Sequence, residues 1–133
     1  MSLLPHHSSD PVCALCTQKL ALVHPDLHKW YVEQIKPIFH DSHISWGFRD
    51  AADQEIAVED GKSKLEFPQS AHNKTPAMAL DLFQIDEAGH AKWDPGYFSV
   101  INQLCAKINA PIIWGGIWKG LGDNDHFQLK LPD

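Results

Sequence analysis

An aspartate inside an apolar stretch constrains the fold of this chain more than any other feature. Asp81 lies between Leu80 and Leu82, in a segment from Met78 to Gln84 that reads as a strand. A carboxylate buried in such a strand needs a cation or hydrogen bonds to offset its loss of water. Neighbouring residues of a strand point to opposite faces, so Asp81 can face a site while the two leucines enter the core. We therefore expect other parts of the chain to supply polar partners for Asp81.

Two histidines are the candidates for those partners. His72 lies in the loop before this strand, and His126 begins the last segment that alternates like a strand. Two imidazoles and one carboxylate leave the fourth position of a zinc ion open, as in catalytic rather than structural zinc sites. Asp123, three residues before His126, is placed to take a proton from water at that position. Either histidine alone is more often a core residue, so the prediction of one zinc ion rests on the whole set.

Local signals predict a mixture of helices and strands. Asp10-Pro11 and Asp94-Pro95 each combine an N-cap with proline at the first helical position. We expect helices over residues 11–22, 25–36, 51–59 and 95–108, strands over 44–48, 78–84, 112–114 and 126–131, and a loop over 61–76. This order predicts one α+β domain over residues 1–133, with a small, mostly antiparallel sheet, flanking helices and a loose start over residues 1–9.

Charge and hydropathy exclude several classes of protein. The formal net charge is −6, and no cluster of lysine and arginine stands out, so the chain lacks the basic surface of a nucleic-acid binder. No run of apolar residues is long enough to insert into a membrane. The first residues contain neither a basic segment nor a long apolar stretch, so we expect no secretory signal peptide.

The chain has three cysteines, and this odd number argues against a disulfide framework. Cys13 and Cys16 form a single Cys-x-x-Cys motif whose spacing places both thiols on one face of a helix. The sequence favours a pair of buried thiols and leaves open a redox pair or a minor metal site that includes His6 or His7. Cys105 lies on the apolar face of a helix and is expected in the core.

Several short motifs along the chain, taken together, are specific enough to indicate a protein family. They are Trp46-Gly47-Phe48-Arg49, Gln54, Gly61-Lys62-Ser63-Lys64, Ser70-x-His72, Asp81, Trp114-Gly115-Gly116-x-Trp118 and Asp123-x-x-His126-Phe127. Their order and spacing resemble the M15 family of zinc peptidases over about residues 22 to 129. That family includes D-alanyl-D-alanine carboxypeptidases, related dipeptidases and phage L-alanyl-D-glutamate endolysins.

The resemblance implies a Hedgehog/DD-peptidase-like fold and a role for each matching residue. It implies zinc ligands at His72, Asp81 and His126, a general base at Asp123, and Arg49 facing a substrate carbonyl or carboxylate, with Ser70 and Gln54 supporting the site or contacting substrate. Asp125 competes with Asp123 for the role of base, but the Asp-x-x-His spacing favours Asp123. Trp114 and Trp118 are equally compatible with the wall of a substrate groove and with core packing.

The function that this resemblance implies is hydrolysis of peptidoglycan stem peptides, with an L-alanyl-D-glutamate endopeptidase of phage or prophage type as the first choice. The alternatives are a D-alanyl-D-alanine carboxypeptidase or dipeptidase of the same family and a non-catalytic zinc-binding module of this fold. The implied endolysin is a monomer that is made in the cytoplasm without a signal peptide. It acts on the cell wall or in the periplasm after a holin-type protein releases it from the cytoplasm.

Overall fold

Helices and strands alternate along the chain, as the sequence predicts. The structure, a computed structural model, describes residues 12–118 and 123–130. The elements are α1 (Ala14–Leu20), α2 (Pro25–Lys29), η1 (Trp30–Ile35), β1 (Ser42–Trp46), α3 (Ala51–Glu59), η2 (Ala71–Asn73), β2 (Ala79–Ile85), β3 (Ala91–Lys92), α4 (Pro95–Lys107), β4 (Ile112–Trp114), η3 (Gly115–Ile117) and β5 (His126–Leu129). The segment η1 is a π-helical continuation of α2, while η2 and η3 are single 3-10 turns.

The strands form one small sheet in the order β1-β2-β5-β4, with β3 also paired to β2. All of these strand pairs are antiparallel. The predicted α+β class with a small antiparallel sheet is therefore confirmed. Strand β2, which carries Asp81, pairs with three neighbours and lies within the sheet rather than at its edge, so its backbone is well fixed.

One face of the sheet carries the hydrophobic core. Leu80 and Leu82 of β2 are fully buried there beside Phe127 of β5, which is paired with Leu80. The rings of Trp30 in η1 and Phe98 in α4 pack against Phe127, with centroid distances of 5.7 Å and 6.4 Å. Burial of these large side chains fixes which face of β2 points inward, and Asp81 consequently points to the opposite face.

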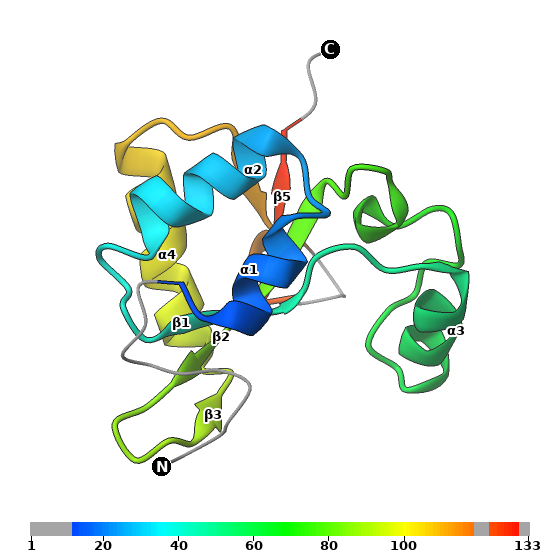
Figure 1. Ribbon diagram of the computed structural model, residues 1–133, viewed down its shortest axis with the longest axis horizontal. Helices are drawn as coiled ribbons and strands as arrows, with labels where there is room; N and C mark the ends of the chain where they lie inside the picture. The colour runs from blue at the N-terminus through cyan, green and yellow to red at the C-terminus, as the bar shows by residue number, and fades with distance from the viewer. Residues whose placement is uncertain (1–11, 119–122, 131–133) are drawn as a thin grey trace.

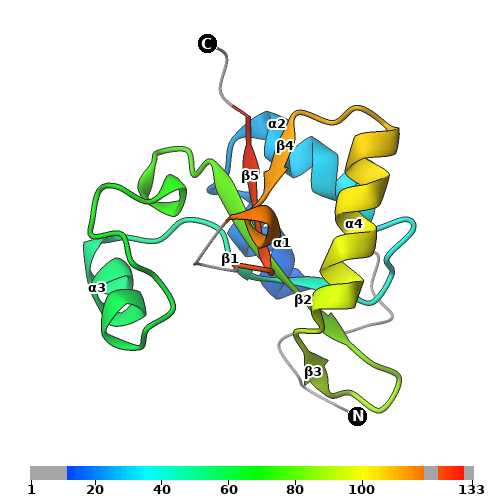
Figure 2. The ribbon, with the colours of Figure 1, turned by 180° about the vertical axis from the view of Figure 1, so that it is seen from behind.

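Helix α3 and the loop that follows it lie to one side of the sheet, and α4 lies on the other side (Figures 1 and 2). Asp50 caps α3 in a reciprocal capping box with Asp53. Gly61 ends the turn after this helix in the left-handed conformation, with φ of 73°, which favours glycine. This arm of the fold returns the chain to the sheet at η2, which carries His72.

Some boundaries differ from the sequence-based expectation. Helix α1 begins at Ala14, with Cys13 as its N-cap, while the Asp10-Pro11 signal and residues 1–9 lie outside the described residues. The short strand β3 was not predicted, because its two residues carry no alternation; it forms by pairing with the end of β2. Within the part of the chain that the structure describes, no helix is long and apolar enough to cross a membrane.

Candidate metal centre

The pairing of β2 with β5 places His126 directly opposite Asp81. Opposite residues of an antiparallel pair project to the same face, so both side chains leave the sheet away from the leucine core. The distance from His126 Nδ1 to Asp81 Oδ1 is 3.1 Å, and both residues are buried. Residues 45 positions apart in the sequence are thus brought into contact by strand register alone.

His72 reaches the same point from the 3-10 turn η2. Ser70 caps this turn and its Oγ accepts a hydrogen bond from the His72 backbone N–H at 3.2 Å. The imidazole Nδ1–H donates to the Gly47 carbonyl at 2.7 Å, which leaves Nε2 to face the site. His72 Nε2 lies 3.1 Å from Asp81 Oδ1 and 3.2 Å from His126 Nδ1.

The His126 ring is oriented by a residue that the sequence analysis missed. Its Nε2–H donates to Gln128 Oε1 at 2.8 Å, so that Nδ1 is the nitrogen turned toward Asp81. Histidines that bind metals commonly donate their second ring nitrogen in this way, which fixes the tautomer. Gln128 is two residues beyond His126 on the same strand, and the alternation of β5 could have identified it.

The three facing atoms fit a tetrahedral zinc site. They lie within 3.2 Å of one another, and ligands about 2 Å from zinc are about 3.3 Å apart in a tetrahedron. Burial alone would raise the pKa of Asp81, but the charge and hydrogen bonds of His72 and His126 outweigh burial and hold this pKa below its usual range. The low pKa keeps Asp81 in the ionised form that binding of a divalent cation requires.

Arg49 is part of the site. The sequence suggested that it faces a substrate group, whereas its guanidinium makes hydrogen bonds to two side chains of the protein. Its Nη2 donates to Asp81 Oδ2 at 3.3 Å, and its guanidinium lies 4.9 Å from the centroid of the Trp46 ring. Nη1 donates to Gln54 Oε1 at 3.1 Å. Arg49 Nε has no hydrogen-bond partner among the described residues. Arg49 therefore orients Asp81 through its hydrogen bond to Oδ2 and also lines the adjoining cavity.

Gln54 fixes the position of the Arg49 side chain through a hydrogen bond. Its side chain is fully buried, and its Oε1 accepts hydrogen bonds from Arg49 and from Asn73 Nδ2 at 3.1 Å each. Its Nε2 donates to Ser63 Oγ at 2.9 Å. Asn73 Nδ2 also donates to the Arg49 backbone carbonyl at 3.0 Å. Asn73 was not predicted, because nothing in its local sequence separates it from an ordinary loop asparagine.

Asp123 lies beside the ligand set. Its Oδ2 is 3.7 Å from His126 Nδ1, and its side chain is 26% exposed. Gly115 makes room for this arrangement: a Cβ at that position would lie 2.5 Å from the Asp123 carbonyl oxygen and 3.1 Å from His126 Cβ. At the neighbouring Asp125, burial, followed by the charges of Asp81 and Asp123, raises the pKa to about 8.

The two tryptophans of the Trp-Gly-Gly-x-Trp motif have different surroundings. Trp114 Nε1 donates to the Asn124 carbonyl at 2.6 Å, which ties β4 to the segment before His126. The Trp118 ring lies 5.1 Å from the His126 ring and lines the smaller of two adjoining cavities. The Trp93 ring stacks on Phe83 with a centroid distance of 5.2 Å, yet Trp93 is 52% exposed and lines the larger cavity.

The ligand set opens into these two cavities, of about 460 Å³ and about 50 Å³. Both are lined by Arg49, Lys62, Asp81 and Asp123. Lys62 thus contributes a positive charge to the walls of both cavities. The larger cavity extends over Ser45, Trp46 and Trp93, so the site has an open approach along the sheet.

Comparison with known proteins gives one informative likeness. No family model matches the sequence, and no curated protein matches it either. Among solved structures, the chain is similar to the Serratia marcescens L-Ala D-Glu endopeptidase ChiX, with 28% sequence identity and a TM-score of 0.68. The alignment covers 87% of this chain and 86% of that one. This likeness supports the α+β, DD-peptidase-like fold over most of the chain.

Proposed function

We propose that this chain is a zinc-dependent peptidase of the M15 type that hydrolyses peptidoglycan stem peptides. The observation that carries the proposal is the convergence of His72, Asp81 and His126 to within 3.2 Å beside an open cavity. The structural likeness to an L-Ala D-Glu endopeptidase supports both an enzyme and a peptidoglycan substrate.

His72 Nε2, Asp81 Oδ1 and His126 Nδ1 are the atoms that would hold the metal ion. When bound, zinc supplies a Lewis acid that polarises a carbonyl group and lowers the pKa of water. The two imidazoles are held in the required tautomers by the Gly47 carbonyl and by Gln128. The protein therefore contributes a preorganised set of donors whose assembly needs little rearrangement.

Asp123 is our candidate for the general base. Its carboxylate lies next to the ligand set, is partly open to solvent and lines both cavities. In this position it can accept a proton from the attacking water and return it to the leaving amine. Asp125 lines only the larger cavity and is the second candidate.

Arg49 has two roles in this account. Its hydrogen bond to Asp81 Oδ2 orients that ligand, and its position on the cavity wall brings its charge toward a bound peptide. A fixed positive charge at this point stabilises negative charge that develops on a carbonyl oxygen, and such contacts are typically worth about 3 kcal/mol. Lys62 adds a second cation that suits the carboxylates of a stem peptide.

We favour cleavage of the L-alanyl-D-glutamate bond over removal of a terminal D-alanine. The larger cavity runs beyond the ligand set toward Trp93, so a peptide can extend past the cleavage point. A carboxypeptidase would instead close its pocket around a free carboxylate. We also propose an origin in a phage or prophage and release of the holin type, in keeping with the family resemblance.

The test is mass spectrometry of the soluble products after incubation of the zinc-loaded protein with purified peptidoglycan. We expect free stem peptides that begin at D-glutamate, with L-alanine left on the glycan strands. Loss of only a terminal D-alanine would move the activity to a carboxypeptidase. Absence of products from protein with confirmed bound zinc would favour a non-catalytic zinc-binding module.

A further inference from the structure

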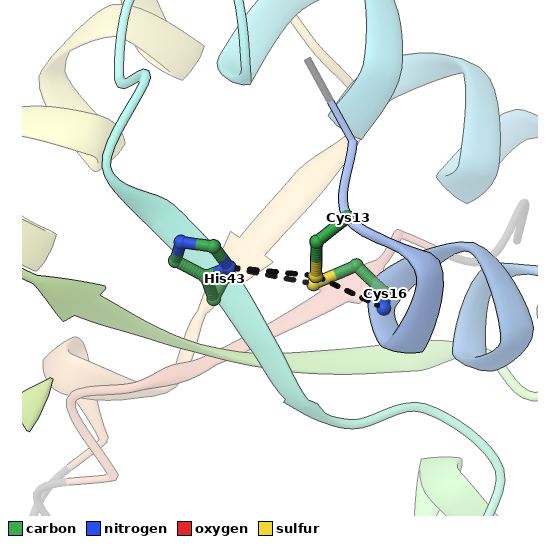
Figure 3. A group of neighbouring side chains, drawn as sticks. All are labelled: Cys13, Cys16 and His43. Carbon is green, nitrogen blue, oxygen red and sulfur yellow. Dashed lines mark hydrogen bonds between the residues drawn. The ribbon is translucent and has the colours of Figure 1, made fainter. Parts of the chain in front are cut away.

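A second group of metal-type ligands lies outside the site described above. Cys13 caps α1, Cys16 lies in its first turn, and both side chains point toward His43 on β1 (Figure 3). His43 Nδ1 is 3.7 Å from Cys13 Sγ and 3.8 Å from Cys16 Sγ, and the three donor atoms all lie within 4.8 Å of one another. All three residues are buried, with at most 1% of their surface exposed.

This group is separate from the candidate catalytic centre. The two sets have no residue in common. His43 is paired with Phe83 at one end of β1, while Trp46, at the other end, is paired with Asp81. Phe83 and Asp81 are two residues apart on β2, about 7 Å along a strand. An ion held by the cysteines would therefore be a second ion rather than a displaced catalytic one.

The spacing of the donors suits a thiophilic cation. Zinc binds cysteine sulfur at about 2.3 Å and histidine nitrogen at about 2.0 Å, so that tetrahedral S and N ligands are about 3.5 Å apart. The observed separations of 3.7 Å and 3.8 Å are close to this value. Two thiolates and one imidazole are soft to intermediate donors, which select zinc over hard cations such as magnesium.

The backbone around the sulfurs also suits thiolates. The Cys16 N–H donates to Cys13 Sγ at 3.4 Å, and the Ile44 N–H donates to Cys16 Sγ at 3.3 Å. Hydrogen bonds to sulfur favour its charged form over the neutral thiol. The ammonium of Lys36 is buried nearby and donates to the Ser42 carbonyl at 2.9 Å, next to His43.

The structure disfavours the redox pair that the sequence left open. Both thiols are 1% exposed, so no soluble partner can reach them. His43 is fully buried and its Nδ1 lies against both sulfurs.

We propose that Cys13, Cys16 and His43 hold a second zinc ion that has a structural role and ties α1 to β1. The described residues supply three donors. A water molecule can complete the tetrahedral set at the fourth position. The zinc ion would stabilise the folded state, because it binds the folded chain in preference to the unfolded chain.

The test is replacement of zinc by cobalt(II) in the full chain under reducing conditions. Cobalt bound to thiolate gives a sulfur-to-metal charge-transfer band in the near ultraviolet, whereas the His72-Asp81-His126 set contains no sulfur. We expect two cobalt ions per wild-type chain and a clear sulfur band. C13S/C16S should lose the band and one ion, while the matched control C105S, which alters the third buried cysteine, should keep both.

A third variant separates this proposal from the proposed function. H126A should lose one ion and all hydrolysis yet keep the sulfur band. Wild-type protein with no sulfur band, or a band that persists in C13S/C16S, would overturn the second site. If C13S/C16S does not fold, X-ray absorption at the zinc edge of wild-type protein still tests the proposal. A zinc ion bound by these cysteines requires zinc–sulfur scattering at about 2.3 Å. Its absence would equally overturn the proposal.

Discussion

His126 faces Asp81 across the β2–β5 pair, and its Nδ1 lies 3.1 Å from the carboxylate that Arg49 holds from the other side. The candidate metal centre is therefore built into the register of the sheet rather than onto a loop. A shift of one residue between these strands would turn His126 into the core and destroy the ligand set. The stability of the sheet and the affinity for metal are linked through this contact.

Removal of the Asp81 carboxylate should affect stability as well as zinc binding. In Asp81→Ala, Arg49 would remain buried without its ionic partner, and breaking a buried pair in this way typically costs about 3 kcal/mol. We expect zinc-free Asp81→Ala to unfold at a lower denaturant concentration than zinc-free wild type. Asp86→Ala removes an ion pair with Lys92, whose side chain is 55% exposed, and is the matched control that should lose much less stability. Equal unfolding midpoints for Asp81→Ala and wild type would contradict the importance of the Arg49 contact.

Gln128 should tune the affinity for zinc without touching the ion. Gln128→Ala removes the acceptor for His126 Nε2–H, so the tautomer that presents Nδ1 is no longer fixed. Loss of such supporting contacts typically weakens metal binding about 10-fold to 100-fold. Competition with a zinc chelator measures this change. Gln103→Ala, on the exposed face of α4, should bind zinc as wild type does. An unchanged affinity in Gln128→Ala would show that β5 alone orients the ring.

Gly115 should tolerate no side chain. The Cβ of Gly115→Ala would meet the Asp123 backbone oxygen at 2.5 Å, so the Asp123 segment must shift away from His126. We expect hydrolysis to fall about 100-fold, since small displacements of catalytic groups have effects of this size. In Gly96→Ala, the nearest atom to the new Cβ is 3.4 Å away, and activity should be retained. Product release from peptidoglycan compares the two, and full activity in Gly115→Ala would place Asp123 outside the mechanism.

Burial of the leucine side chains of β2 should contribute much of the free energy of unfolding. Leu82→Ala leaves a cavity against the helices of the core, and such changes typically cost about 3 kcal/mol. Leu22→Ala removes a side chain that is already 55% exposed and should cost much less. Denaturant unfolding of the two variants under the same conditions gives the comparison. Similar losses in both would mean that this face of β2 is not the centre of the core.

The sequence predicted those parts of the fold that depend on local patterns. The β2 strand followed from its apolar residues, and Asp81 attracted attention because a carboxylate is out of place there. Helix α4 followed from its Asp94-Pro95 start. The match to His72 and His126 came from motif order rather than from geometry, and only the strand register shows that His126 and Asp81 are neighbours.

The features that the sequence did not predict depend on contacts between distant segments. The Arg49 hydrogen bond to Asp81 joins residues 32 positions apart, and no local pattern signals it. His43 was not singled out from the sequence, and only the fold places it against Cys13, 30 positions earlier. β3 is defined by the pairing of its two residues with Gln84 and Ile85, beyond the part of β2 that pairs with β5.

The most direct test of the account measures bound zinc and hydrolysis together in wild type and Asp123→Ala. Asp123 is not among the three metal-facing atoms, so we expect the variant to keep the same zinc content as wild type. Its hydrolysis of peptidoglycan should fall at least about 100-fold, as expected for loss of a general base. Wild-type turnover in Asp123→Ala would contradict the mechanism, and loss of zinc from the variant would make Asp123 a ligand rather than the base.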